Sequence, residues 1–229
     1  MSQAPDKPDS LDSVPDSHLG FESARDLEAI SAHIKRYWGS IEFVLHEKKS
    51  SFVHIDIHVV APTPERPYRV LITSGMSDRP MKVREGGEDF GYVELILAVP
   101  DTWPINHASF SDERNYWPIR QLTRAARAPH AHQYDLWYAH TIADGEEPEA
   151  FAPDVGFCAN IVSVPLLCDE EGCSLKISPE KRIHFLTILP IYREEWQFAM
   201  KSGSMALLEK LDEAGVVEVI VKDRENVCA

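Results

Sequence analysis

The chain has 229 residues, of which 44% are hydrophobic, and this is enough for one large domain or two small ones. Its 37 Asp and Glu side chains outnumber its 23 Lys and Arg side chains, so the formal net charge is −14 at pH 7. Nucleic acids and anionic membranes attract clustered Lys and Arg, so this charge argues against both as partners and favours a basic protein.

Residues 1–20 are expected to form a disordered tail, and residues 21–229 one domain. Residues 1–17 are rich in Asp, Pro and Ser and contain few core-forming side chains. They lack the basic and apolar regions of a signal peptide, and no later apolar run reaches the roughly 18 residues of a membrane-spanning helix. We therefore expect a cytoplasmic protein with reduced cysteines.

The first regular element is expected to be a helix. Ser23 can cap it and Gly39 can end it. Between them, apolar side chains recur at near-helical spacing: Leu27, Ile30, Ile34 and Trp38. Strands are then expected at 41–46, 53–60, 69–73 and 92–99, where β-branched and apolar residues concentrate. The turn-rich connection at 62–67 favours antiparallel neighbours.

The second half of the chain is expected to contain both helices and strands. Pro118 stands near the first turn of a helix that runs to about Arg127, with three apolar side chains facing inward: Ile119, Leu122 and Ala126. An exposed acidic loop is expected at 144–154. Strands follow at 157–167, 175–177, 183–191 and 216–221, and helices at 194–201 and 204–214. These separate runs predict an α+β fold, in which helices flank a mixed, largely antiparallel sheet.

Residues 68–81 carry the most specific pattern in the chain. A β-branched run breaks at a polar, glycine-containing segment, which predicts a buried strand entering a tight loop: Thr73, Ser74, Gly75, Met76, Ser77, Asp78 and Pro80. Gly75 is expected to have a positive φ, and Ser77 and Asp78 to hydrogen-bond the turn backbone. Neither Ser74 nor Ser77 has the flanking glycines of a nucleophile elbow, so no serine nucleophile is predicted.

This loop resembles the signature of the suppressor of fused family, and further segments are similar to family motifs in the same order. These segments are 53–63, 92–100, 117–119, 140–142 and 183–211, so the likeness runs from about Leu27 onward. Ala139 stands where the family often has a glycine before its His-Thr pair, so this turn is expected to differ.

The resemblance implies a non-enzymatic domain that binds another protein and needs no cofactor. The chain has room for this one domain, as in bacterial members, whereas larger eukaryotic members add a second domain and sequester transcription factors. Stand-alone members resemble immunity proteins, which neutralise a toxin by binding it. A basic toxin domain is therefore a candidate partner, because an acidic inhibitor would attract it at long range.

A histidine-containing strand offers an alternative reading as a metal-dependent hydrolase. The period of a strand places His54, Asp56 and His58 on one face, where they could hold a metal ion. A half-exposed strand with a polar outer face gives the same alternation, and this is the favoured interpretation. Glu94 stands alone in an apolar strand, either as a general base or, more commonly, with a structural partner such as an arginine.

The cysteines suggest a second possible metal site. Cys168 and Cys173 enclose four residues and could bind zinc together with His184 or Cys158. Structural zinc normally needs four ligands at tighter spacing, so a simple turn between strands is favoured.

Aromatic and arginine side chains concentrate between residues 103 and 138. Such enrichment is typical of binding hot spots, although most tryptophans in a domain of this size pack the core. The arginines could instead pair with acidic residues of the same chain. The candidate interface drawn from this region consists of five residues: Trp117, Arg120, Arg124, Trp137 and Tyr138.

Overall fold

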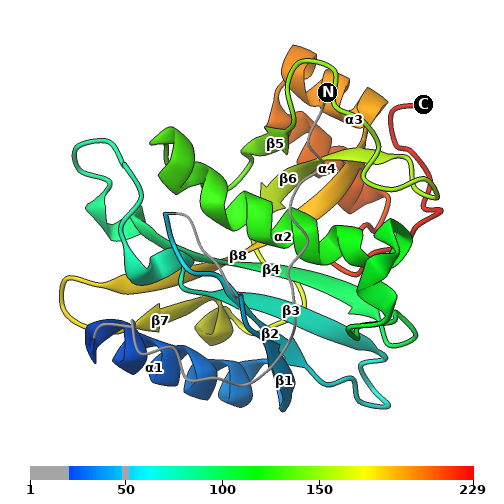
Figure 1. Ribbon diagram of the computed structural model, residues 1–229. Coiled ribbons are helices and arrows are strands. Elements are labelled where there is room, and N and C mark those ends of the chain that lie inside the picture. The colour runs from blue at the N-terminus through cyan, green and yellow to red at the C-terminus, as the bar shows by residue number, and fades with distance from the viewer. Residues whose placement is uncertain (1–20, 48–51) are drawn as a thin grey trace, which may run out of the picture.

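The computed structural model describes residues 21–47 and 52–229, so the tail expected at residues 1–20 lies outside the described residues. Within these ranges one sheet contains eight strands in the order β1-β2-β3-β4-β8-β6-β5, with β7 beside β8 (Figure 1). The strands are β1 (Ile41–Leu45), β2 (Asp56–Val60), β3 (Tyr68–Ser74), β4 (Tyr92–Pro100), β5 (Thr141–Ala143), β6 (Phe157–Ser163), β7 (Ser174–Lys176) and β8 (Arg182–Tyr192).

The sheet is antiparallel except where β4 and β8 pair in parallel. Strands β1 to β4 follow one another in space as in sequence. Between β4 and β8 the chain passes through a long helix and three further strands, which is enough chain to return β8 in the parallel direction. The predicted α+β fold with a mixed, largely antiparallel sheet is therefore confirmed.

Helices α1 (Phe21–Tyr37) and α2 (Glu113–His132) cover opposite faces of the sheet (Figure 1). Side chains alternate along a strand, so neighbouring residues of β3 enter different clusters. Leu71 belongs to the apolar cluster that contains Trp117 of α2. Ile72 belongs to the cluster that contains Ile34 of α1. The sheet is therefore buried on both sides along its central strands.

A helical hairpin covers the other end of the sheet. It consists of α3 (Arg193–Ser202) and α4 (Ser204–Glu213), and Leu207 of α4 shares an apolar cluster with Ile161 of β6 and Ile191 of β8. No helix in the described part of the chain is long and apolar enough to cross a membrane.

Pro118 was predicted to lie near the first turn of a helix, but helix α2 begins at Glu113, five residues earlier. Asp112 caps it by accepting a hydrogen bond from the Arg114 amide at 3.0 Å. Pro118 lies inside the helix, where it cannot donate to the Arg114 carbonyl four residues earlier. Lys222 Nζ donates to that carbonyl instead, at 3.4 Å. A partner distant in the sequence thus makes the internal proline tolerable.

Other predicted boundaries also differ from the structure, and strand β5 was not predicted. Helix α1 already includes Phe21, so Ser23 does not cap it, although Gly39 has the positive φ expected after its end. Strand β2 begins at Asp56 instead of residue 53. Residues 216–221 form only an isolated parallel bridge between Val219 and Ala98 of β4.

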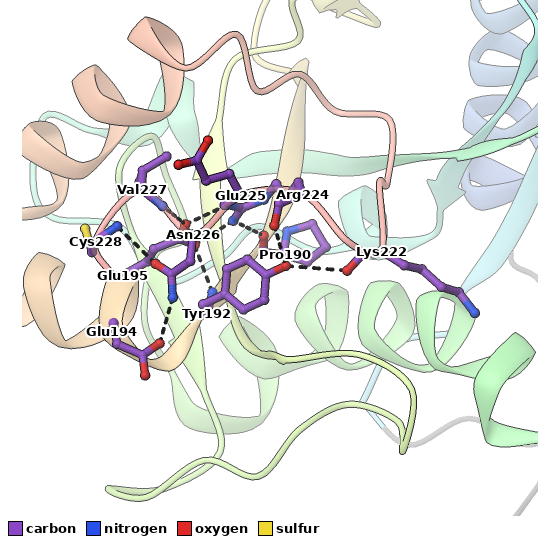
Figure 2. Close-up of polar contacts among 10 residues, drawn as sticks. All are labelled: Pro190, Tyr192, Glu194, Glu195, Lys222, Arg224, Glu225, Asn226, Val227 and Cys228. Carbon is purple, nitrogen blue, oxygen red and sulfur yellow. Dashed lines mark hydrogen bonds and ion pairs between the residues drawn. The ribbon is translucent and has the colours of Figure 1, made fainter.

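A buried ion pair helps to hold the C-terminal segment (residues 216–229) in place (Figure 2). Both guanidinium Nη atoms of Arg224 contact the carboxylate of Glu195, at 2.6 and 2.5 Å, and the Glu195 side chain is fully buried. The same carboxylate accepts from the Tyr192 and Val227 amides. The Tyr192 hydroxyl donates to the Arg224 carbonyl at 2.7 Å. These contacts fix the segment against β8 and α3.

Candidate functional site

The loop after β3 is a tight turn that only glycine fits. Gly75 has a φ of 100°, as predicted from the sequence. A Cβ atom at Gly75 would lie 1.9 Å from the His54 carbonyl oxygen, which belongs to the backbone and cannot rotate away. The requirement for glycine therefore comes both from the left-handed backbone and from the close approach of the segment that precedes β2.

Glu94 of β4 holds this loop through four hydrogen bonds. Its Oε1 accepts from the Gly75 amide at 2.9 Å, the Ser77 amide at 2.9 Å and the Ser77 hydroxyl at 2.6 Å. Its Oε2 accepts from the Thr73 hydroxyl at 2.6 Å. The Ser77 hydroxyl was expected to bond the turn backbone and instead bonds Glu94. The partners of Glu94 are amides and hydroxyls, where the sequence had favoured an arginine.

The environment of Glu94 suits a structural carboxylate. Burial raises the pKa of Glu94 to about 6, while the hydrogen bonds from Ser77 and Thr73 act in the opposite direction. The side chain has no exposed surface, so it cannot reach a substrate proton. Its geometry thus ties two strands and the signature loop together.

The predicted polar face of β2 is buried under α1. Asp56 and His58 are 5% and 1% exposed, so the expectation of an outer face was wrong. Asp56 accepts from the Glu47 amide and contacts His46 Nδ1 at 2.8 Å and His54 Nε2 at 3.0 Å. Asp56 therefore organises the connection between β1 and β2, and His46 is a partner that the sequence reasoning missed.

His58 has a different partner from His54 and Asp56. Its Nε2 lies 3.0 Å from Ser74 Oγ, and its Nδ1 has no partner among the described residues. Burial lowers the pKa of His58 to about 4. Although a hydroxyl and an imidazole meet here, the second ring nitrogen lacks an orienting group, and the nearby Gly75 amide is engaged by Glu94. The arrangement does not assemble a nucleophile.

No group of three or more His, Cys, Asp or Glu side chains in the described residues is arranged to hold a metal ion. Cys168 and Cys173 lie together, but His184 bonds the Asp89 carbonyl and Cys158 packs in the cluster under α3 and α4. The candidate zinc ligands therefore lie at three separate positions in the fold.

The five candidate interface residues do not form one surface. Trp117 is completely buried, and its ring stacks on Phe151 with centroids 5.5 Å apart. Trp137 makes an edge contact with the exposed ring of Phe90, and Tyr138 packs beside the α3–α4 cluster. Arg120 donates to the Phe151 carbonyl and Arg124 pairs with Asp144, so both arginines do have partners within the chain.

Arg124 also lines a groove of about 450 Å³ between α2 and β5, which we call the α2–β5 groove. β5 is the last strand of the sheet, and among the described strands it pairs only with β6, so one edge is unpaired (Figure 1). The groove is lined by Gln121, Arg124, Arg127, Ala128, Ala131, His132, Tyr134, Thr141, Ile142, Ala143, Asp144 and Phe151.

Gln121 in the lining of this groove and Asn160, to which it is bonded, are buried amides with unpaired hydrogen-bonding atoms. Asn160 Nδ2 donates to Gln121 Oε1 at 3.3 Å, which leaves Gln121 Nε2 and Asn160 Oδ1 without partners in the described residues. Rotating both amides by half a turn would only exchange the paired and unpaired atoms. In either orientation Gln121, which lines the groove, keeps one buried amide atom without a partner in the described residues.

An acidic loop (residues 144–151) borders the groove, since Asp144 and Phe151 at its two ends line it. The loop exposes Glu146, Glu147 and Glu149. Its middle is fixed by the buried Pro148, whose carbonyl accepts from Arg193 at 2.5 Å. A negatively charged rim therefore stands beside the unpaired edge of β5.

Only faint signals for the groove can be read from the sequence. Asn160 stands inside the apolar run of β6, and a buried asparagine needs partners. Gln121 is one of many polar residues on α2, and nothing local shows that it faces Asn160, which is 39 residues away.

The sequence profile of the Suppressor of fused protein (SUFU) family matches residues 52–225. No curated protein sequence matches the chain. Among solved structures, the chain is similar to a suppressor of fused homolog from Neisseria gonorrhoeae, with a TM-score of 0.62 and 18% identity over 87% of this chain and 95% of that one.

Two further structures share this fold. A chain of the Sufu–Fu complex has a TM-score of 0.59 and 13% identity, over 88% of this chain and 91% of that chain. Drosophila Suppressor of Fused has a TM-score of 0.60 and 14% identity over 88% of this chain, which corresponds to 51% of the Drosophila chain. The family profile covers most of the sequence and includes the signature loop, and the chain therefore belongs to the suppressor of fused family.

Proposed function

We propose that this protein is a non-enzymatic domain that binds another protein, and that the α2–β5 groove receives a segment of the partner. The observation that carries the proposal is the combination of a groove, an unpaired strand edge and the unsatisfied amide of Gln121. An extended segment can pair its backbone with a free strand edge while its side chains fill an adjacent groove. The Sufu–Fu complex is an example of a related fold together with a protein partner.

The chemistry of the groove favours a basic partner segment. The acidic loop exposes three glutamates, whereas two arginines of the groove are already neutralised within the chain: Arg124 by Asp144 and Arg127 by Glu47. A segment with Lys or Arg beside its groove-filling residues would therefore gain attraction without displacing a resident ion pair. The Gln121 amide would bond a polar group of the bound segment, which removes the cost of an unpaired buried atom.

A finer proposal is that the partner is a basic toxin domain, which this protein neutralises by binding. The net charge of −14 supports it, because an acidic inhibitor meets a basic target faster than a neutral one. Inhibition of a toxin by tight binding would also explain why this domain has a groove and an acidic rim but no catalytic site assembled among its described residues.

The test is to isolate the partner and then fill the groove. The partner is identified by affinity purification from the native host, and its affinity is measured for the wild type and for Ala128→Trp, which places a large ring in the groove. We expect Ala128→Trp to weaken binding at least tenfold while the melting temperature is retained. Glu209→Trp on the exposed face of α4 is the matched control and should bind normally. Equal affinities for all three proteins would exclude the groove as the binding site.

A further inference from the structure

Cys168 and Cys173 form a dithiol pair that the protein-binding function does not use. Their Sγ atoms are 3.5 Å apart, and both side chains are partly exposed. The short 3-10 helix η4 (Glu170–Cys173) brings them together, closed by a 2.8 Å hydrogen bond from the Gly172 amide to the Asp169 carbonyl. A small movement of the side chains would bring the sulfur atoms to bonding distance.

The turn that carries the pair is fixed to α1. The Gly172 carbonyl accepts hydrogen bonds from His33 Nε2 at 3.0 Å and from Trp38 Nε1 at 3.4 Å. A Cβ atom at Gly172 would lie 3.1 Å from Cys168 Sγ, so the sulfur packs directly over the glycine. The two thiols are therefore held near each other by tertiary contacts, and their proximity does not depend on the turn alone.

The two thiols differ in their surroundings. Cys168 packs against the apolar cluster under α1, whereas Cys173 lies outside that cluster with its Sγ 3.7 Å from the Asp169 carbonyl. The outer thiol is the better placed to meet a reagent from solution. The inner thiol is then positioned to react with it.

We propose that Cys168 and Cys173 are a site of reversible disulfide formation, with a low-molecular-mass disulfide as the oxidant. The Cys173 thiolate attacks one sulfur of the small disulfide, which forms a mixed disulfide and releases one small thiol. The Cys168 thiolate then attacks Cys173 Sγ and releases the second small thiol. The protein loses two protons and two electrons, and the small disulfide gains both.

Other reactions of these thiols have less support. Zinc would need further ligands, and among the described residues no third His, Cys, Asp or Glu joins the pair in a metal-binding arrangement. Burial raises the pKa of both thiols, so each exists mainly as the thiol at neutral pH and exchange is slow. A thiol with a high pKa is also a poor leaving group, so reduction of the disulfide by exchange should be slow as well.

The experiment incubates the full chain with a glutathione redox buffer, quenches with acid, blocks free thiols with N-ethylmaleimide and measures intact and peptide masses. We expect two of the four cysteines to escape alkylation, in a linked peptide that contains residues 168 and 173. In Cys168→Ser the reaction should stop at a mixed disulfide on Cys173. In Cys228→Ser, the matched control, the internal disulfide should form as in the wild type.

A second probe removes any dependence on the choice of oxidant. Phenylarsine oxide binds two neighbouring thiols at once, so one equivalent should bind to the wild type and none to Cys168→Ser. Failure of the wild type to bind the arsenical would contradict the proposed pair. Persistent separate glutathione adducts on Cys168 and Cys173, or thiols that stay reduced in an oxidising buffer, would contradict disulfide formation.

Discussion

At Gly75, the left-handed backbone and steric crowding both disfavour a Cβ atom, and the two effects can be separated by mutation. Gly75→Ala should lower the free energy of unfolding by at least about 3 kcal/mol. The added Cβ atom is disfavoured in the left-handed conformation and clashes with the His54 carbonyl. Gly145 also has a positive φ, 72°, but open space around it. Gly145→Ala should therefore cost only the backbone term of about 1–2 kcal/mol. Denaturant titration of both variants measures the difference, and equal losses would remove crowding as a cause.

Glu94 makes the stability of the protein depend on pH in a defined direction. Its pKa is about 6 in the folded protein and near 4.5 in the unfolded chain, so the folded state binds the proton more tightly. The contribution is therefore fully present below pH 4.5 and is lost as the pH rises to about 6. A difference of this size corresponds to about 2 kcal/mol.

The Glu94 effect is measured as the difference in unfolding free energy between the wild type and Glu94→Gln, which does not titrate. We expect the wild type to lose about 2 kcal/mol relative to Glu94→Gln between pH 4.5 and 7. Comparison with this variant cancels the opposite effect of His58, whose lowered pKa makes folding less favourable as the pH falls from 6.5 to 4. A wild type that instead gains stability with pH would show that the four donors outweigh burial.

Residues whose role is set by the local backbone could be predicted from the sequence, and residues whose role depends on distant partners could not. The positive φ of Gly75 follows from its place at a strand end. The alternation of His54, Asp56 and His58 was also readable, but the helix that covers this face begins at Phe21, far earlier in the chain. Trp117 gave an ambiguous signal because a tryptophan in the core and one at an interface have the same local pattern.

Among the elements, the C-terminal segment depends most on a single side chain. Arg224→Met should lower the free energy of unfolding by about 3–5 kcal/mol, because it leaves the fully buried Glu195 carboxylate without its cation. Hydrogen exchange should accelerate at the amides of residues 216–228. Arg114→Met, which removes the exposed pair with Asp112, is the control and should have little effect. A loss in Arg224→Met no larger than in the control would mean that the segment is held by its other contacts.

Most of the elements were predictable apart from their ends, but the three-residue strand β5 was not predicted. Strong apolar runs predicted β3, β4, β6 and β8, and the separation of helices from strands along the chain predicted the fold class. The start of α2 was missed because an internal proline usually marks a first turn, and Lys222, which satisfies the freed carbonyl, is 108 residues away. Residues 216–221 have strand composition but form one bridge to β4, and the carboxylate of Glu218 accepts from the Leu166 and Leu167 amides.

For the whole molecule, the charge of −14 creates a field that acts before any contact forms. The Debye length falls from roughly 30 Å at 0.01 M salt to about 8 Å at 0.15 M, so attraction of a basic partner should weaken as salt rises. Close contacts in the groove are screened much less, so dissociation should change little. The composition gives only the total negative charge, whereas the structure places part of this charge in the acidic loop beside the groove.

The central claim, that a basic partner binds at the α2–β5 groove beside the acidic loop, is tested most directly by association kinetics with the purified partner. Two triple variants change the net charge equally, one in the acidic loop and one on α4: Glu146→Lys, Glu147→Lys and Glu149→Lys; and Glu209→Lys, Asp212→Lys and Glu213→Lys. At low salt we expect the loop variant to associate more than tenfold more slowly than the wild type and the α4 variant to be affected several-fold less, with the gap closing as salt rises. Equal slowing by both variants, or an association rate that is indifferent to salt, would contradict binding at this site.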